Sequence, residues 1–202
     1  VIGGDGTFRG AGVFSTEYDI PIVGIPGTID NDMYGTDFTI GFDTALNTVV
    51  ETVDKIKDTA SSHDRMFFIE VMGRDAGFVA LQSGIATGAE SILIPEVEGQ
   101  AAKLKEYLET GNKRKKTSNI ILVAEGNNVG GARELAKKTA EDFKEYDVRV
   151  NVLGHMQRGG SPSAFDRFLA SRLGVAAVEA LMDNQRSIMV GFQNHQIVHV
   201  PF

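Results

Sequence analysis

The sequence predicts an α/β fold built from mainly parallel sheets. Short β-branched runs alternate with longer amphipathic stretches along the 202 residues, and the 23 glycines gather where those runs end. Strands alternating with helices give parallel strands joined by crossover helices. In open sheets of this kind, ligands bind at the carboxyl ends of the strands. The glycine-rich strand ends therefore predict where a site lies.

The expected strands are short runs of apolar and β-branched residues. They cover residues 1–2, 22–25, 66–71, 91–94, 119–124, 149–153 and 188–190. Two helices show a buried stripe at i, i+3, i+4 and i+7 spacing. The first stripe is Leu46, Val49, Val50, Val53 and Ile56, and the second is Phe165, Leu169, Leu173, Ala176 and Ala180. Ser161 and Pro162 predict the start of the second helix, since serine caps free N–H groups and proline suits a first turn.

Composition excludes several classes of protein. Hydrophobic residues make up 42% and charged residues 23% of the chain, as in an ordinary globular protein. The absence of cysteine excludes a disulfide framework or a thiolate metal site. A net charge of −7 argues against nucleic acid as the main partner. The apolar runs are too short to span a bilayer and no signal peptide is visible, so we expect a cytoplasmic protein.

The two ends of the sequence suggest a fragment. The chain opens inside an expected strand without an initiator methionine, and it closes at Pro201-Phe202 with no terminating signal. We therefore expect it to be part of a longer chain.

The first candidate motif is Gly3-Gly4-Asp5-Gly6-Thr7, directly after an expected strand. Glycines let the backbone approach a phosphate closely, and successive N–H groups can cradle it. Aspartate repels an anion, so Asp5 is understandable as a ligand of Mg²⁺, directly or through water. A tight turn with a solvated aspartate is the alternative interpretation.

The second motif, at residues 26–32, reads PGTIDND and also follows an expected strand. Its two carboxylates, Asp30 and Asp32, stand behind the hydroxyl of Thr28. This pattern suits phosphoryl transfer to an alcohol, because one carboxylate can accept the proton of the alcohol and the other can orient it or the metal. A polar turn with Asx hydrogen bonds is the alternative.

Two further motifs carry cations. Arg74 lies in the glycine-rich turn VMGRDAG after residues 66–71, where its planar fork can reach a phosphate. His155 and Arg158 lie in GHMQRGGSP, between a strand and a helix N-terminus, which is typical of an anion site. Surface salt bridges and a structural histidine are the alternatives. Together the four motifs favour metal-assisted phosphate chemistry on a hydroxyl substrate.

Six motifs occur in the order known from bacterial-type ATP-dependent 6-phosphofructokinases, which this chain resembles over essentially its whole length. They are GGDGT, PGTIDND, SSHDR, VMGRDAG, AEG at residues 124–126 and GHMQRGGSP. The resemblance implies transfer of the γ-phosphoryl group of MgATP to the 1-hydroxyl of fructose 6-phosphate, in glycolysis. It also implies two Rossmann-like lobes. Residues 1–41 and 157–202 would form a nucleotide lobe truncated at its N-terminus, and residues 42–156 a fructose 6-phosphate lobe.

The resemblance also implies residue roles. Asp30 is expected to be the catalytic base, flanked by Thr28 and Asp32, and Arg74 to stabilise the transferred phosphoryl group. Asp5 is expected to associate with Mg²⁺, and Gly4, Gly6 and Thr7 to lie along the ATP phosphates. The substrate set is Thr28, Ile29, Asp30, Met72, Gly73, Arg74, Glu125, His155 and Arg158, joined by Arg65 and Arg149, which resemble arginines that reach a neighbouring subunit's sugar site. A homotetramer follows from that sharing.

Donor and effector can also be argued from the resemblance. Small residues at Gly6 and Gly27 leave room for a nucleoside and favour ATP over pyrophosphate. Gly88 and Glu90 match the region where the family binds a nucleotide diphosphate effector, and the basic run ending at Lys116 lies where the effector phosphates bind. Lys57 stands where an arginine is common, which weakens bidentate contact with a phosphate. A solvated basic loop is the alternative for that run.

Three alternatives to an ATP-dependent 6-phosphofructokinase stay open at the level of sequence. The polypeptide could be a non-catalytic fragment that binds sugar phosphate, or part of a pyrophosphate-dependent phosphofructokinase. The third alternative keeps phosphoryl transfer but changes the acceptor, because lipid and NAD kinases also carry GGDG, although they lack the combination of PGTIDND and GHMQRGGSP.

Overall fold

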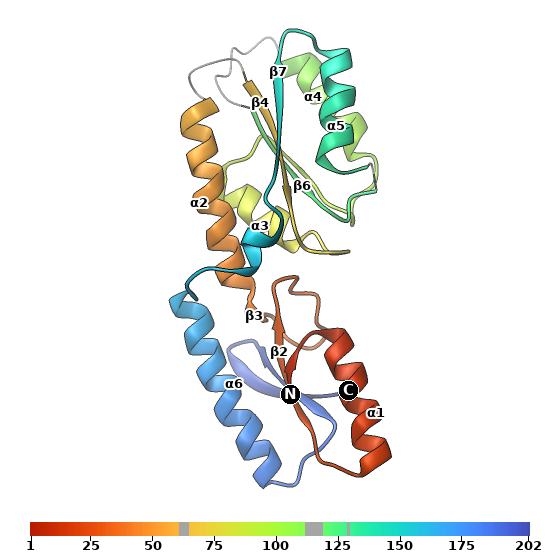
Figure 1. Ribbon diagram of the computed structural model, residues 1–202, viewed down its shortest axis with the longest axis vertical. Helices are drawn as coiled ribbons and strands as arrows, with labels where there is room; N and C mark the ends of the chain where they lie inside the picture. The colour runs from red at the N-terminus through yellow and green to blue at the C-terminus, as the bar shows by residue number, and fades with distance from the viewer. Residues whose placement is uncertain (61–64, 112–118, 129) are drawn as a thin grey trace. The chain divides into compact units, whose positions relative to one another are not determined.

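A computed structural model of the chain describes residues 1–60, 65–111, 119–128 and 130–202 (Figure 1). Strands and helices alternate, and the sheets are mainly parallel, so the predicted α/β class is confirmed. The chain divides into two compact units, Val1–Thr44 with Ser161–Phe202, and Ala45–Gly160. It stays a prediction that one unit binds nucleotide and the other binds sugar phosphate.

The first unit contains a five-stranded sheet. Its strands are β1 (Ile2–Gly3), β2 (Val23–Thr28), β3 (Ile40–Gly41), β8 (Ile188–Gln193) and β9 (Gln196–Pro201). The order is β1-β2-β8-β9, with β3 also pairing to β2. All pairs are parallel except β8 with β9, an antiparallel hairpin. The sequence analysis did not predict β3 or β9.

Two helices, α1 (Asp5–Tyr18) and α6 (Ala164–Met182), cover opposite faces of this sheet (Figure 1). Consecutive residues of β2 show why. Val23 packs in a buried cluster with Leu169 and Leu173 of α6. A side chain at Gly24 would collide with Phe8 of α1, so this glycine allows α1 to approach β2 closely. Successive residues of a strand face opposite sides, which places one helix on each.

The second unit contains a parallel sheet of four strands in the order β5-β6-β4-β7. These are β4 (Arg65–Val71), β5 (Ser91–Leu93), β6 (Asn119–Ala124) and β7 (Asp147–Val152). Each was predicted to within two residues at either end. β4 and β6 are central, and their apolar runs at residues 66–69 and 120–124 are buried, as expected for central strands of a parallel sheet.

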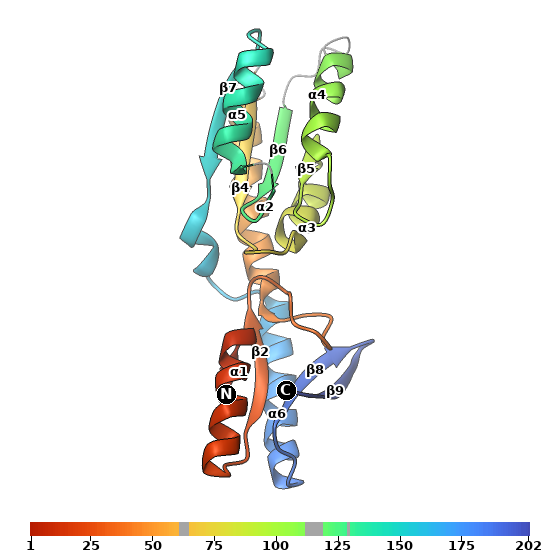
Figure 2. The same ribbon diagram turned by 90° about the vertical axis from the view of Figure 1, so that its right-hand side faces the viewer.

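Helices cover both faces of this second sheet (Figure 2). They are α2 (Phe42–Ala60), α3 (Phe78–Thr87), α4 (Gln100–Gly111) and α5 (Gly131–Asp142), with a 3₁₀-helix, η2 (Gly154–Arg158), after β7. Met66 and Phe68 of β4 face the cluster formed by α4 and α5. Gly84 of α3 packs against Ile92 and Leu122, on the opposite face. Among the residues described, no helix is long and apolar enough to cross a membrane.

The predicted start of α6 was wrong by a few residues. The helix begins at Ala164, and its N-cap is Ser163, whose hydroxyl accepts a hydrogen bond from the Asp166 N–H at 3.1 Å. Ser161 and Pro162 belong to the preceding loop. The motif Ser-x-x-Asp at 163–166 is the capping signal that the sequence offered for the correct start.

Candidate functional site

The Gly3–Thr7 motif, expected either to cradle a phosphate or to form a tight turn, is partly helical. Asp5, Gly6 and Thr7 form the first turn of α1, and Gly4 is its N-cap. The Gly4 carbonyl accepts hydrogen bonds from the N–H groups of Thr7 at 3.0 Å and Phe8 at 3.2 Å. A helix N-terminus presents free N–H groups and the positive end of the helix dipole, which together favour an anion. The motif therefore offers a candidate phosphate site at a helix N-terminus, in place of a glycine-rich loop.

Asp5, the expected Mg²⁺ ligand, is exposed and pairs with Arg9 one turn later, with 2.9 Å between Oδ2 and Nη2. No group of three or more potential metal-ligating His, Asp or Glu residues occurs in the described part of the chain. Mg²⁺ usually takes only one or two protein carboxylates, keeps several waters and binds substrate phosphates. A single carboxylate beside a helix end suited to phosphate fits an ion that is carried mainly by phosphate oxygens and water.

The second motif lies beside the first. Pro26, Gly27 and Thr28 are the last residues of β2, not a loop after it, and Gly3 of β1 is the register partner of Pro26. A Cβ placed on Gly4 would stand 3.6 Å from the Thr28 Cβ, and one on Gly27 would stand 3.0 Å from Ile2 Cγ2. Parallel pairing of β1 and β2 thus brings the two motifs together at one edge of the sheet.

Beyond Thr28 the chain leaves the sheet in a bend that carries the two aspartates. The Asp30 N–H donates to the Thr28 hydroxyl at 3.2 Å, a local turn bond. Asp30 is half-buried and Asp32 is exposed. Asn31 between them has a left-handed backbone, with φ of 52°. The bond from Asp30 to Thr28 is an ST-turn rather than an Asx turn, and the bend is a polar turn that carries both carboxylates.

In the second unit, the turn after β4 is organised by Glu125, which follows β6. The Glu125 carboxylate accepts hydrogen bonds from the N–H groups of Gly73 at 3.4 Å and Arg74 at 2.8 Å. Arg74 has a left-handed φ of 54°, which these bonds help to hold. Its side chain is 71% exposed, with Nε 3.7 Å from Asp75 Oδ2. An exposed guanidinium on a fixed backbone is available to an anion.

Gln157 connects the same turn to η2. Its side chain is almost fully buried, accepts a hydrogen bond from the Met72 N–H at 3.1 Å and donates one to the Gly154 carbonyl at 3.0 Å. His155 and Arg158, on the same short helix, are exposed. The carboxyl ends of β4, β6 and β7 thereby carry the predicted residues Met72, Gly73, Arg74, Glu125, His155 and Arg158.

Arg65 and Arg149 do not join that set. Arg65 begins β4, at the opposite end of the sheet, and its register partner is Asp147. Asp147 Oδ1 lies 2.9 Å from Arg149 Nε, and its Oδ2 lies 3.3 Å from Arg65 Nε. The hydrogen bond from Arg149 is the main cause that lowers the pKa of the Asp147 carboxyl, with a smaller contribution from Arg65. The two arginines form a separate basic cluster around one carboxylate.

Among the residues expected to bind an effector, Lys57 and Glu90 make hydrogen bonds within the protein. Lys57 Nζ donates to the Thr87 carbonyl, directly before Gly88, the left-handed C-cap of α3. Glu90 accepts a hydrogen bond from the Tyr107 hydroxyl. Lys116 and the rest of its basic run lie outside the described residues, as do residues 61–64 of the SSHDR motif.

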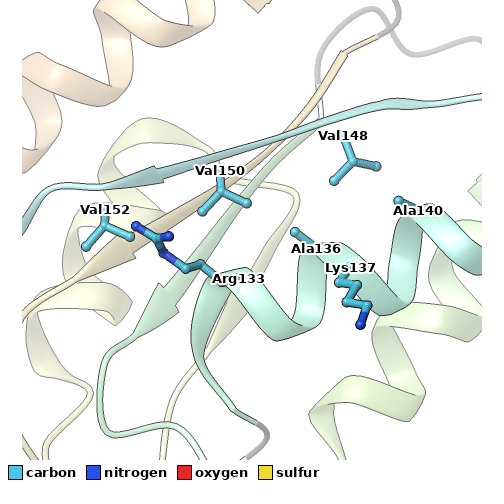
Figure 3. A pocket seen from close by; sticks show the side chains of 7 residues that line it. All are labelled: Arg133, Ala136, Lys137, Ala140, Val148, Val150 and Val152. Carbon is cyan, nitrogen blue, oxygen red and sulfur yellow. The ribbon is translucent and has the colours of Figure 1, made fainter.

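A shallow hollow of about 500 Å³ lies between α5 and β7 (Figure 3). Val148, Val150 and Val152 line one side of it, and Arg133 and Lys137 project from α5 on the other. None of the predicted site residues lines it. The candidate chemistry therefore lies at the strand ends described above.

Sequence reasoning missed several polar residues that build these strand ends. Asn31 and Thr39 hydrogen-bond to each other across the bend after β2. Asp166 accepts a hydrogen bond from the Gly41 N–H just before α2, and Gln157 accepts one from the Met72 N–H in the turn after β4. Only Asp166 had a sequence signal, the capping motif at 163–166. The others are single polar residues whose partners are distant or irregular in sequence.

The fold and these strand ends define an α/β protein whose glycines, carboxylates and cationic side chains gather at the carboxyl ends of parallel strands. The family model described as Phosphofructokinase matches residues 1–181. The chain belongs to the phosphofructokinase family.

Relatives and solved structures agree with this assignment. The chain is 56% identical, over all of its length, to ATP-dependent 6-phosphofructokinase 2 of Bacteroides thetaiotaomicron, covering 62% of that protein. It is 58% identical over 94% of its length to ATP-dependent 6-phosphofructokinase 1 of Thermus thermophilus, covering 59% of it. The structure of phosphofructokinase from Saccharomyces cerevisiae superposes on the whole of this chain with a TM-score of 0.92 and 33% sequence identity. The match covers 31% of the yeast chain. The chain thus spans about three fifths of the length of these curated relatives.

Proposed function

We propose that the whole protein transfers the γ-phosphoryl group of ATP to the 1-hydroxyl of fructose 6-phosphate in the cytoplasm, giving ADP and fructose 1,6-bisphosphate. The observation that carries the proposal is the packing of Thr28 beside Gly4, 3.6 Å from a Cβ placed there. It puts an acidic bend next to a helix end suited to phosphate. The curated relatives named ATP-dependent 6-phosphofructokinase support the same reaction.

In the proposed reaction, Asp30 accepts the proton as the O–H bond of the 1-hydroxyl breaks. The hydroxyl oxygen forms a bond to the γ-phosphorus, and the bond from that phosphorus to the β–γ bridging oxygen breaks, so that ADP leaves with its electron pair. Thr28 and Asp32 flank this position. Gly4, Gly6 and Thr7 lie along the phosphates through the first turn of α1. Asp5 would hold Mg²⁺, which neutralises charge on the phosphates when it is bound.

In the second unit, Arg74 would stabilise the negative charge of the transferred phosphoryl group. Met72, Gly73, Glu125, His155 and Arg158 would line the sugar phosphate site. Their common position at the carboxyl ends of three parallel strands supports this grouping.

The cluster of Arg65 and Arg149 supports a shared active site. Both arginines lie away from the carboxyl end of their own sheet, so we assign them to the sugar phosphate of a neighbouring copy in a homotetramer. Lys57, Gly88, Glu90 and Lys116 are assigned to a nucleoside diphosphate effector.

ATP is the proposed donor. A Cβ on Gly6 would meet no atom within 4 Å, so a larger residue there would project into the space before the α1 terminus. The alternative is pyrophosphate, and the pyrophosphate-dependent enzyme of Marinobacter aquaeolei shares the fold, with a TM-score of 0.80 and 25% identity. A linked-enzyme assay with each donor decides: turnover with pyrophosphate and none with ATP would overturn the donor assignment.

Replacing Asp30 with asparagine tests the base. The substitution keeps the shape of the side chain and removes its ability to accept the proton, so we expect kcat to fall by about 10²–10⁴-fold while fructose 6-phosphate still binds. Turnover at the wild-type rate would refute the role. Calorimetry on the 202-residue chain addresses the fragment alternative, since sugar phosphate binding without ATP binding would support it.

A further inference from the structure

The bend that carries Asp30 is clamped from both sides by one buried threonine. The Thr39 hydroxyl lies 2.7 Å from the Thr28 carbonyl oxygen and 3.1 Å from Asn31 Oδ1, with its single proton able to serve either. The Thr39 N–H donates to Asn31 Oδ1 at 2.8 Å. Thr39 is 1% exposed. The residues on both sides of the Asp30 bend are therefore tied to the same point.

Asn31 supplies the other half of the clamp. Its Nδ2 donates to the Asp37 carbonyl at 3.1 Å, so its amide group bridges two residues of the loop between β2 and β3. Its φ of 52° is left-handed, where asparagine and glycine are tolerated far better than other residues. This reversal sends the chain from Asp30 toward Asp32 in a direction that no regular secondary structure imposes.

The loop that receives these bonds is itself fixed to the sheet. The Asp37 N–H donates to the Phe192 carbonyl of β8 at 2.8 Å, and the Asp37 carboxylate accepts from the Asn194 N–H at 2.8 Å. The Phe192 N–H donates to the Thr36 hydroxyl at 3.0 Å. A continuous set of hydrogen bonds thus runs from the β8–β9 hairpin through residues 36–39 to the bend.

We propose that Asn31 and Thr39 are positioning residues that hold the Asp30 carboxylate in its productive place; this inference rests on the proposed role of Asp30 as base. A base must lie within hydrogen-bonding reach of the proton that it removes. A displacement of about 1 Å can cost about 10²-fold in rate. Neither Asn31 nor Thr39 is assigned to the substrate, so their loss acts on the rate through Asp30.

The test compares Thr39→Val with Thr39→Ser in the whole protein. Valine matches the shape of threonine without the hydroxyl, and serine keeps the hydroxyl. We expect Thr39→Val to lower kcat by about 10–100-fold. KM for both substrates should stay within about twofold, the signature of an interaction that matters in the transition state. Thr39→Ser should recover kcat to within about threefold of wild type.

Thr52→Val is the matched control. It removes a threonine hydroxyl that donates to the Thr48 carbonyl at 2.7 Å within α2, outside the loop between β2 and β3, so it should leave kcat within about threefold of wild type. If Thr52→Val lowers kcat as much as Thr39→Val does, the effect is not specific to the Asp30 bend and the proposal is overturned.

If Thr39→Val does not fold, Asn31→Gly provides a second test of the positioning role. Glycine accepts the left-handed backbone but loses the amide bonds, and we expect the same fall in kcat at nearly constant KM. Wild-type kcat in the folded variants, alongside an inactive Asp30→Asn, would overturn the positioning role and leave the proposed function standing. Absence of turnover in the wild-type protein would overturn both.

Discussion

The strongest stability prediction concerns Asp166, a carboxylate that is 2% exposed at the start of α6. Its Oδ1 accepts a hydrogen bond from the Gly41 N–H at 2.9 Å, and its Oδ2 accepts from the Thr44 N–H at 2.9 Å and from the Thr44 hydroxyl. These donors are the last residue of β3 and the first turn of α2. One buried charge therefore fixes the start of α2 to the first turn of α6.

The substitution Asp166→Asn keeps one acceptor oxygen and replaces the other with an NH₂ group. One of the two backbone donors, the Gly41 N–H or the Thr44 N–H, then faces a donor instead of an acceptor. Losing a charge-assisted hydrogen bond costs about 1.5–3 kcal/mol, and a buried donor left without a partner costs about 1–3 kcal/mol. These two costs overlap, so we expect the free energy of unfolding to fall by about 2–4 kcal/mol.

The assay is urea unfolding followed by far-UV circular dichroism, at one protein concentration for all variants, with linear extrapolation to water. Glu179→Gln is the control, because it removes the same charge from an exposed position on α6 and should change stability by less than about 0.5 kcal/mol. Adding Thr44→Val to Asp166→Asn should cost less than the sum of the single effects, because the two residues share one interaction. An Asp166→Asn variant as stable as Glu179→Gln would refute the reasoning.

Two further predictions concern the second unit. Gln157→Leu leaves the Met72 N–H without its acceptor, so we expect a loss of about 1–3 kcal/mol in unfolding free energy and weaker fructose 6-phosphate binding in calorimetry; unchanged affinity would contradict the role of η2. The hydrogen bond from Arg149, with a smaller contribution from Arg65, lowers the pKa of Asp147 from its ordinary value of 3.8. The contribution of this carboxylate to stability is therefore present above that value and lost as the pH falls below it through the folded pKa. Asp147→Asn should flatten the pH dependence of the unfolding midpoint below pH 3.8, and an identical acid profile would count against the pairing.

Much of the fold could be predicted because its signals are local. The strands 119–124 and 66–71 contain continuous apolar runs at residues 120–124 and 66–69, which are typical of strands buried on both faces of a parallel sheet. The antiparallel strand β9 was missed because its six residues show no strict alternation and lie at the edge of the sheet. The helical first turn at Asp5–Thr7 was missed because glycine is typical of loops, and helix formation here depends on the Gly4 carbonyl and on Phe8 packing against Gly24.

The sequence by itself determined the α/β class, the chemical types gathered at the strand ends and the family resemblance, because each depends on residues close together in the chain. Only the tertiary structure decided which of those residues meet. Parallel pairing of β1 with β2 brings Thr28 beside Gly4, and the sheet order places Arg65 and Arg149 around Asp147, away from Met72 and Arg74. The clamp of Asn31 and Thr39 also came from the structure alone, because hydrogen bonds across an irregular loop follow no sequence period.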